Sequence, residues 1–286
     1  MSKSARSIDH GSHVFNAIML DAHNPSPMTG AGNHTYLIID EHGSAVLIDA
    51  GVGESHHLEE LATTLEDHHA QLRDVLVTHA HPDHASGVTA IARVHRGARF
   101  FKYPWPEEDR RYAVDWQPIH EGDRITVGDH TLVALHTPGH SPDHTAFWHE
   151  DSRTVFTGDL VVQGSSVMIH ATRGGDLGQY LDSLQRLLTL GPSRLLPAHG
   201  PDVTNPESLL RSYLEHRRMR EAQVIAALAA GRDAVPAIVE SIYDGLSPAL
   251  VPAATENVQA HLEKLRREGR VIEQNGRWTI SASPQS

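Results

Sequence analysis

The sequence predicts an α+β protein made of two parts that differ in their pattern of apolar residues. From about residue 13 to residue 200, short apolar runs alternate with loops, which is typical of a domain built on β-strands with helices between them. After residue 205, three helical stretches are followed by one tight hairpin, which is the order of a winged-helix module. The chain has 286 residues, 39% of them hydrophobic, and this suffices for one large domain and a small appended one. We therefore expect a larger domain over residues 1–205 and a helical, winged-helix domain over residues 206–286.

The strands of the larger domain are expected as two hairpins and two single strands. Residues 33–39 are predicted to pair with residues 45–49, around a turn at residues 41–44. Residues 145–148 are predicted to pair with residues 154–156 in the same way. The single strands are DVLVT at 74–78 and the start of SRLLPAHG at 193–200, and both open into loops rich in histidine or glycine.

Two helices are expected in the larger domain. Residues 85–96 have helical character and Gly97 is a stop signal. The second helix has Asp176 as its N-cap with Gln179 three residues later, and Gly191-Pro192 ends it. Its apolar residues repeat at helical spacing: Leu177, Tyr180, Leu181, Leu184, Leu187 and Leu188.

The smaller domain begins where Asn205-Pro206 can cap a long helix that runs to about Gly231. Two further helices are expected near residues 233–243 and 254–268. Residues 271–280 predict a hairpin around Asn275-Gly276, a dipeptide typical of tight two-residue turns.

Composition narrows the possible partners. The net charge is −12 with histidine neutral, which disfavours general binding to nucleic acid, because phosphate contacts supply most of that affinity. No apolar run reaches eighteen residues and the N-terminus has no leader pattern, so we expect no membrane partner. Without cysteine the chain can form no disulfide and offer no thiolate ligand, which fits a cytoplasmic protein.

The main chemical signal is His79-Ala80-His81-Pro82-Asp83-His84, directly after the strand at residues 74–78. It places four metal-binding side chains within six residues. Imidazole and carboxylate groups suit zinc, and they are also compatible with iron or manganese. In a loop, His79 and His81 can face one metal while Asp83 and His84 face another, and Pro82 restricts the backbone between them.

Three further candidate ligands lie downstream at predicted strand ends, beside glycine or proline: His140, Asp159 and His199. The carboxylate of Asp159 has two oxygens and can bridge two metals. Three histidines on one metal, and an aspartate with two histidines on the other, would leave room for a bridging water whose pKa the metals lower. His144 is expected to support the site rather than to bind metal.

These motifs resemble those of the metallo-β-lactamase superfamily: HAHPDH at 79–84, GHS at 139–141, TGD at 157–159 and AHG at 198–200, preceded by LIDAG at 47–51. The resemblance implies an αββα sandwich with two zinc ions at one edge. It implies that Asp159 lies between the metals, that Asp49 supports the site without binding metal, and that Asp83 is also catalytic because it orients the attacking water. It divides the remaining ligands into His79, His81 and His140 on the first metal and Asp83, His84 and His199 on the second.

A narrower resemblance is to the branch of this superfamily that carries a C-terminal winged helix. The loop at residues 24–30 (NPSPMTG) is similar to a loop of that branch, whereas residues 33–37 (NHTYL) stand where the family usually has TNTYL. This branch includes an endoribonuclease that cuts single-stranded RNA, together with glyoxalase-like and thioesterase-like relatives. The shared motifs imply the catalytic machinery but leave the substrate open.

Four functions are compatible with these observations. The first is hydrolysis of a small ester, thioester or lactone, in which metal-activated hydroxide attacks a carbonyl. The second is cleavage of single-stranded RNA, with Arg173 as a substrate-binding residue in a basic rim that also contains Arg217, Arg218 and Arg220. The third is a DNA-binding regulator that uses the basic residues of the last helix: Lys264, Arg266, Arg267 and Arg270. The fourth is an iron-dependent persulfide dioxygenase, which keeps the same HxHxDH pattern.

Overall fold

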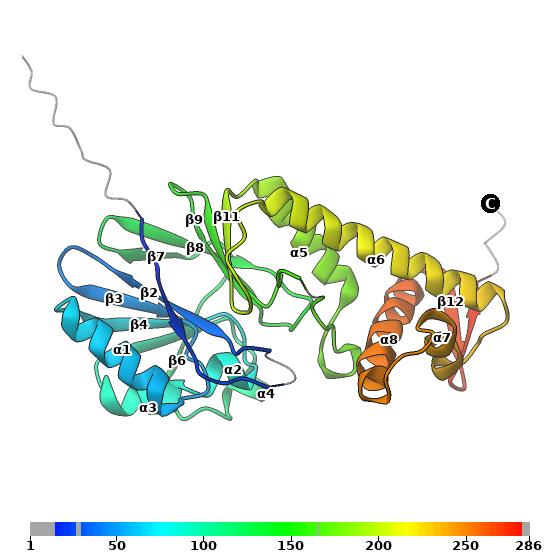
Figure 1. Ribbon diagram of the computed structural model, residues 1–286, viewed down its shortest axis with the longest axis horizontal. Coiled ribbons are helices and arrows are strands. Elements are labelled where there is room, and N and C mark those ends of the chain that lie inside the picture. Colours follow the sequence, from blue (N-terminus) through cyan, green and yellow to red (C-terminus); the bar gives the residue numbers. More distant parts are fainter. Residues whose placement is uncertain (1–14, 27–29, 165, 282–286) are drawn as a thin grey trace, which may run out of the picture.

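The computed structural model describes residues 15–26, 30–164 and 166–281 and shows two β-sheets packed face to face, with helices on both outer faces (Figure 1). The first sheet contains six strands in the order β1-β2-β3-β4-β5-β6, and the second contains five in the order β11-β10-β9-β8-β7. The bounds in the first sheet are β1 Ile18–Asp21, β2 His34–Ile39, β3 Ser44–Ile48, β4 Gln71–Val77, β5 Arg99–Lys102 and β6 Trp116–Pro118. In the second sheet they are β7 Arg124–Val127, β8 His130–His136, β9 Thr145–His149, β10 Thr154–Gly158 and β11 Arg194–Pro197.

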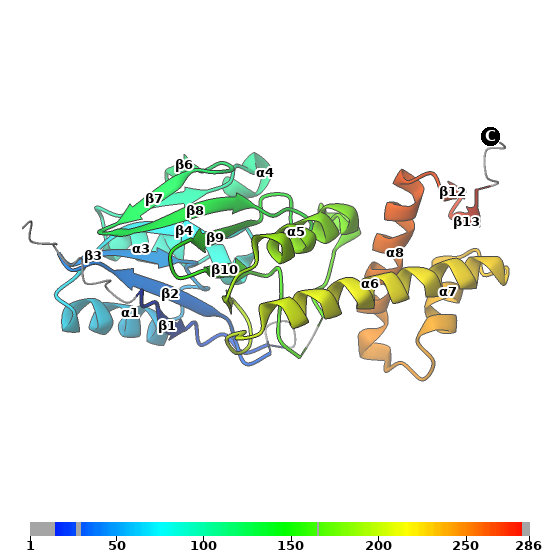
Figure 2. The same cartoon turned by 90° about the horizontal axis from the view of Figure 1, so that it is seen from above.

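Three buried apolar clusters define the layers. The cluster between the sheets joins inward residues of both, such as Ile38 and Leu76 from the first sheet and Phe147 and Phe156 from the second. The outer face of the first sheet is covered by α1 (Ser55–Asp67) and α3 (Val88–Val94). The outer face of the second sheet is covered by α5 (Leu177–Leu190) and by the first half of α6 (Pro206–Ala229). The predicted αββα sandwich is therefore confirmed (Figure 2).

Strand direction brings the ends of several strands to one edge of the sandwich. Strand β3 is parallel to β4, β10 is parallel to β11, and the antiparallel β8-β9-β10 pairing makes β8 run in the direction of β10. The loops that follow β3, β4, β8, β10 and β11 consequently meet at the same edge, and these are the loops that carry the histidine and aspartate motifs.

The helix expected over residues 85–96 differs from the one observed. The structure has one helical turn, α2 (Pro82–Ala85), and a separate helix α3 that begins at Val88. The break lies at Gly87, whose N–H donates to Gly51 O at 2.9 Å. A Cβ atom at Gly87 would lie 1.9 Å from Ala50 O, so the chain departs from one continuous helix where it packs against the backbone after β3.

The C-terminal part extends away from the sandwich along α6 (Figure 1). Asn205 caps α6 by accepting from Ser208 N at 3.4 Å, as predicted. The remaining elements are α7 (Val235–Ile242), the 3-10 turn η2 (Pro248–Leu250), α8 (Val251–Arg267), and the hairpin of β12 (Val271–Gln274) with β13 (Arg277–Ile280). Helix α8 begins three residues earlier than expected, and Asn275 and Gly276 form the hairpin turn with φ of 54° and 75°.

Helix α6 packs against both parts of the chain. Its first half contributes Leu210 and Leu214 to the cluster beneath the second sheet, and its second half contributes Val224 and Leu228 to the C-terminal cluster. The domain boundary predicted at residues 205 and 206 therefore falls at the start of a helix that both cores share, and it stays a prediction. Among the described residues, none of the helices combines the length and apolar character needed to cross a bilayer.

Candidate metal centre

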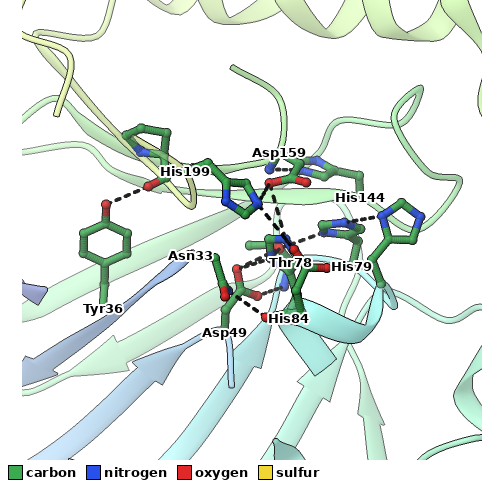
Figure 3. Close-up of polar contacts among 12 residues, drawn as sticks. Asn33, Tyr36, Asp49, Thr78, His79, His84, His144, Asp159 and His199 are labelled. Carbon is green, nitrogen blue, oxygen red and sulfur yellow. Dashed lines mark hydrogen bonds and ion pairs between the residues drawn. The ribbon is translucent and has the colours of Figure 1, made fainter. Parts of the chain in front are cut away.

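The sandwich edge brings together all seven predicted ligands. Figure 3 shows His79, His84, Asp159 and His199 among them. His79 and His81 lie in the loop after β4, and Asp83 and His84 lie on the single turn of α2. The other three follow β8, β10 and β11 respectively: His140, Asp159 and His199. The segments are distant in sequence, but their ligand atoms form two groups within which all atoms lie within 4.8 Å of one another.

The first group consists of His79, His81, His140 and Asp159. His81 Nδ1 lies 2.9 Å from His79 Nε2 and 2.9 Å from His140 Nε2. Asp159 Oδ2 lies 3.4 Å from His140 Nε2. Four atoms around one zinc ion at about 2.0–2.1 Å would be roughly 3.3 Å apart, so the group has the size of a tetrahedral metal site.

The second group consists of Asp83, His84, Asp159 and His199. Asp159 Oδ1 lies 3.3 Å from His84 Nε2 and 3.2 Å from His199 Nε2. Asp83 Oδ2 lies 3.5 Å and 3.4 Å from the same two nitrogens. Asp159 thus directs one oxygen to each group, which is the arrangement expected of a bridging carboxylate.

The buried polar atoms of the site favour a bound cation. Within the described residues, His84 Nε2 and Asp159 Oδ1 are buried 3.3 Å from each other, and neither makes a contact with hydrogen-bond geometry, although unsatisfied buried polar atoms are costly. A divalent metal ion would satisfy both atoms and would offset the paired carboxylates of Asp83 and Asp159. The donor set of imidazole and carboxylate groups therefore fits divalent metal ions, and it is compatible with zinc as well as iron.

Hydrogen bonds behind the histidines fix which ring nitrogen faces the site. His140 Nδ1 donates to Met168 O at 2.9 Å, and His199 Nδ1 donates to Gly32 O at 3.2 Å. A carbonyl oxygen can only accept, so in both rings the lone pair of the neutral form is on Nε2, the nitrogen that faces the other ligands. Such outer partners orient metal-binding imidazoles and raise their basicity.

Asp49 supports His84 and the start of the motif loop. Its Oδ1 accepts from Thr78 N at 2.8 Å, and its Oδ2 accepts from Thr78 Oγ1 at 3.0 Å and from His84 Nδ1 at 2.8 Å (Figure 3). Because Thr78 Oγ1 donates to Asp49, it accepts from His79 Nδ1 at 3.1 Å, which leaves His79 Nε2 for the first group. Asp49 is buried and has φ of 61°, a strained backbone conformation of the kind that occurs at functional sites.

His144 lies behind the first group and does not face it as a ligand. Its Nε2 accepts from the backbone N–H of Asp159 at 3.1 Å, so its Nδ1 carries the proton and donates to Thr137 Oγ1 at 2.8 Å. His144 is completely buried and holds the backbone of the bridging residue. The supporting role expected of His144 from the sequence stays a prediction.

The pKa values of the histidines differ between the two groups. Burial lowers the pKa of His79 well below its usual 6.5, and burial with the neighbouring His140 charge lowers the pKa of His81 to about 3. Burial also opposes protonation of His199, but the adjacent carboxylates of Asp159 and Asp83 outweigh it and raise its pKa to about 10. For His84 the same balance of burial against three carboxylates raises the pKa well above 6.5. In the metal-free protein the second group thus retains protons that a metal must displace.

Two supporting residues near the second group carry no clear sequence signal. Asn33 donates from Nδ2 to Asp83 O at 2.7 Å and so holds the α2 turn against β2. Tyr36 donates from its hydroxyl to Pro197 O at 2.8 Å, two residues before His199. His34, for which the sequence suggested no role, is intermediate in exposure and has a buried Nδ1 without a hydrogen-bond partner among the described residues. Part of the family-like loop at residues 24–30 (residues 27–29) lies outside the described residues.

The structure excludes one arginine of α6, Arg217, from the basic rim considered from the sequence. Arg217 is 2% exposed, donates to Val167 O, and stacks over the Tyr180 ring at 5.4 Å, so it belongs to the core. Arg218 is exposed and lies 3.8 Å from Glu215. Arg220 lies over the Tyr243 ring at 4.2 Å. A long helix rich in arginine suggests an exposed face, but here one guanidinium points inward.

Arg173 occupies an exposed position in the short 3-10 turn η1 (Ala171–Arg173). Its side chain forms no ion pair within the described part of the chain. The loop that carries Arg173 contacts the first group, because His140 Nδ1 donates to Met168 O at 2.9 Å, and Arg173 N donates to His170 O at 2.9 Å within the same loop. Arg173 therefore lies in a loop that contacts the first group, and its role in substrate binding stays a prediction.

The basic residues in α8, and Arg270 just after it, form ion pairs with nearby acids. Lys264 lies 2.6 Å from Glu221 and 2.7 Å from Glu268, and Arg266 lies 2.6 Å from Glu263. Two further pairs join Arg267 to Asp176 and Arg270 to Glu221. The opposite face of α8 buries Val258, Leu262 and Leu265, so the helix packs against its neighbours on one side and is ion-paired on the other.

A sandwich with a two-group histidine and aspartate site at its edge defines a metalloenzyme. Residues 28–199 match the metallo-beta-lactamase superfamily, and residues 234–278 match the beta-lactamase associated winged helix domain. The chain belongs to the metallo-beta-lactamase superfamily, and it is an enzyme of the metal-dependent hydrolase type that characterises this family.

Several curated relatives resemble most of the chain. Lactamase-like protein adaB of Aspergillus niger is 32% identical over 268 residues, which cover 87% of this chain and 79% of that protein. The beta-lactamase-like protein 2 homolog of Drosophila melanogaster is 30% identical over 261 residues and covers 87% of each. An atrochrysone carboxyl ACP thioesterase of Aspergillus fumigatus is 33% identical over 210 residues, or 72% of this chain and 62% of that protein.

Solved structures show the same fold. A metallo-beta-lactamase family protein from Thermus thermophilus is 21% identical with a TM-score of 0.74 and covers 92% of this chain and 98% of its own. The protein TTHA1623, solved in a di-iron-bound form, is 29% identical with a TM-score of 0.53 and covers 68% of this chain and 95% of its own.

Proposed function

We propose that this enzyme uses two zinc ions to hydrolyse a thioester, or a related small ester or lactone. The observation that carries the proposal is the position of Asp159, which directs one carboxylate oxygen to each of two adjacent ligand groups. A metal pair at such a site lowers the pKa of water and polarises a carbonyl group. The first zinc ion would be held by the three imidazoles of the first group and Asp159, and the second zinc ion by Asp83, His84, Asp159 and His199.

The chain's own residues set the protonation needed for acyl transfer. Asp83 is 23% exposed at its side chain, against 14% for Asp159, so it is the carboxylate more open to a substrate. Burial opposes ionisation of Asp83, but His84 and His199 outweigh this effect and lower its pKa. An ionised Asp83 can accept a proton from the attacking water and return it to the leaving thiolate or alkoxide. His144 and Asp49 hold Asp159 and His84 in place during this exchange.

Two observations favour an acyl substrate. One relative that is 33% identical to this chain is named an ACP thioesterase. Arg217 is buried and the cations of α8 are ion-paired, so much of the cationic surface that a nucleic acid would require is neutralised or inaccessible. The net charge of −12 agrees with this view.

The exposed Arg173 favours a second candidate, cleavage of a phosphodiester in single-stranded RNA. Its side chain forms no ion pair within the described residues, and its loop contacts His140 through Met168 O at 2.9 Å, so it could bind a phosphate beside the metals. Arg173→Glu should then abolish RNA cleavage and spare turnover of a neutral thioester. Arg218→Glu is the matched control, because Arg218 is equally cationic but already lies near Glu215.

The test is a direct comparison of substrates with the zinc-loaded protein. We expect turnover of an acyl thioester that is lost with a chelator and in the Asp83→Ala variant. Cutting of labelled single-stranded RNA that disappears in both controls, with no thioester turnover, would replace the proposal by the ribonuclease function. Metal analysis of the purified protein belongs to the same experiment, because iron with persulfide oxidation would point instead to a dioxygenase.

A further inference from the structure

A buried ion-pair network lies directly behind the first metal group. Lys102, at the end of β5, is 1% exposed, and Asp143, in the loop between β8 and β9, is completely buried. Lys102 Nζ donates to Asp143 Oδ2 at 2.8 Å and to Tyr103 O at 2.6 Å, and it lies 2.7 Å from Asp109 Oδ1. All three ammonium protons thus have an oxygen nearby, as a buried lysine requires.

The network holds the backbone on both sides of the first group. Asp143 Oδ2 also accepts from the backbone N–H of Ala80 at 2.8 Å, and Asp143 Oδ1 accepts from Ser141 Oγ at 2.7 Å. Ala80 lies between His79 and His81, and Ser141 follows His140. The carbonyl of Ala80 is fixed as well, because it accepts from the Tyr112 hydroxyl at 2.6 Å.

We propose that Asp143, held by Lys102, is a positioning residue that sets the geometry of the first metal group. One carboxylate ties together the loop that carries His79 and His81 and the loop that carries His140. Within the described residues, the hydrogen bonds and ion pairs of Asp143 do not reach the second group, whose members lie on α2 and after β10 and β11. Loss of the Asp143 charge should therefore weaken zinc binding at the first group and leave zinc binding at the second group nearly unchanged. This inference rests on the proposed metal centre.

The experiment measures zinc affinity by competition with a chromophoric chelator in two backgrounds. His199→Ala removes a ligand of the second group only, and His140→Ala removes a ligand of the first group only. We expect Asp143→Asn to weaken zinc binding about 10-fold to 100-fold in the His199→Ala background, and less than about threefold in the His140→Ala background. Asp74→Asn is the matched control, because Asp74 is a 1% exposed carboxylate on β4 paired with Arg99 at 2.7 Å, far along the strand from the ligands.

Thermal unfolding of the metal-free variants separates positioning from plain stability. Asp143→Asn and Asp74→Asn should both lower the unfolding temperature, and only Asp143→Asn should lower the affinity of the first group. If Asp143→Asn does not fold, Ser141→Ala removes a single hydrogen bond of the network and should shift affinity in the same direction. Equal losses in both backgrounds, or no loss in either, would overturn the inference. A wild-type protein that binds no pair of metals would instead refute the proposed centre itself.

Discussion

The substitution Asp49→Asn tests whether the contacts behind the ligands control metal binding. The substitution keeps the size of the side chain. It also keeps the left-handed backbone conformation of residue 49, because asparagine tolerates φ near 61° as readily as aspartate does. It removes the charge and one of the acceptors. An amide that still accepts from Thr78 N must present its NH₂ group where Oδ2 accepted from His84 Nδ1 at 2.8 Å.

The expected consequence is a change of tautomer in His84. Facing an NH₂ donor, His84 Nδ1 becomes an acceptor, and the proton of the neutral ring moves to Nε2, the atom that faces the second group. A hydrogen bond to a charged group contributes about 1.5–3 kcal/mol, and a lost outer partner typically costs about 10–100-fold in metal affinity. Since each tenfold change equals about 1.4 kcal/mol, the two estimates agree.

The assay is zinc competition with a chelator in the His140→Ala background, which leaves only the second group complete. We expect Asp49→Asn to weaken this binding at least about tenfold, and Asp74→Asn to leave it unchanged. Retention of affinity within about threefold by Asp49→Asn would show that the tautomer of His84 does not depend on this contact.

Three further outcomes follow from the geometry of the site. The pKa of His199 is raised to about 10 in the metal-free protein, so its proton must leave when metal binds. Below about pH 10, the zinc affinity of the second group should therefore rise by about tenfold per pH unit for each proton released. Calorimetry in buffers of different ionisation enthalpy measures this proton release, and a release of zero would contradict the prediction. Gly139→Ala should cost at least about 1–3 kcal/mol in chemical unfolding, because Gly139 has φ of 131° and an added Cβ would lie 2.2 Å from Tyr180 N; an unchanged midpoint would count against the packing. Tyr36→Phe should cost about 1–3 kcal/mol by leaving Pro197 O unpaired, with the first group's zinc affinity unchanged, as unfolding and chelator competition would show.

The ligands could be predicted from sequence because their signals are local. His79 to His84 lie within six residues, and the remaining ligands each follow a short apolar strand beside glycine or proline. Their neighbours could not be predicted in the same way. The partners of His140 and His199 are backbone carbonyls of Met168 and Gly32, and a carbonyl carries no residue-type signal.

Some parts of the fold could be predicted from the sequence pattern, and others could not. The hairpins at residues 33–49 and 145–156 are recognisable because their apolar runs are bounded by clear turns. Strands β5 and β6 have only four and three residues. The pairing of β5 with β4 and of β6 with β5 depends on contacts distant in sequence. The burial of Arg217 could likewise not be predicted from the sequence, because it depends on a carbonyl in the loop after β10 and on the ring of Tyr180.

The central claim is that a pair of metals bound by the two groups performs acyl hydrolysis. The most direct measurement is a zinc titration of the metal-free protein in which thioester hydrolysis and bound zinc are followed together, alongside His81→Ala. We expect hydrolysis to rise until two equivalents are bound and to be absent in His81→Ala. Thioester hydrolysis at full rate without metal, or in His81→Ala, would contradict the claim.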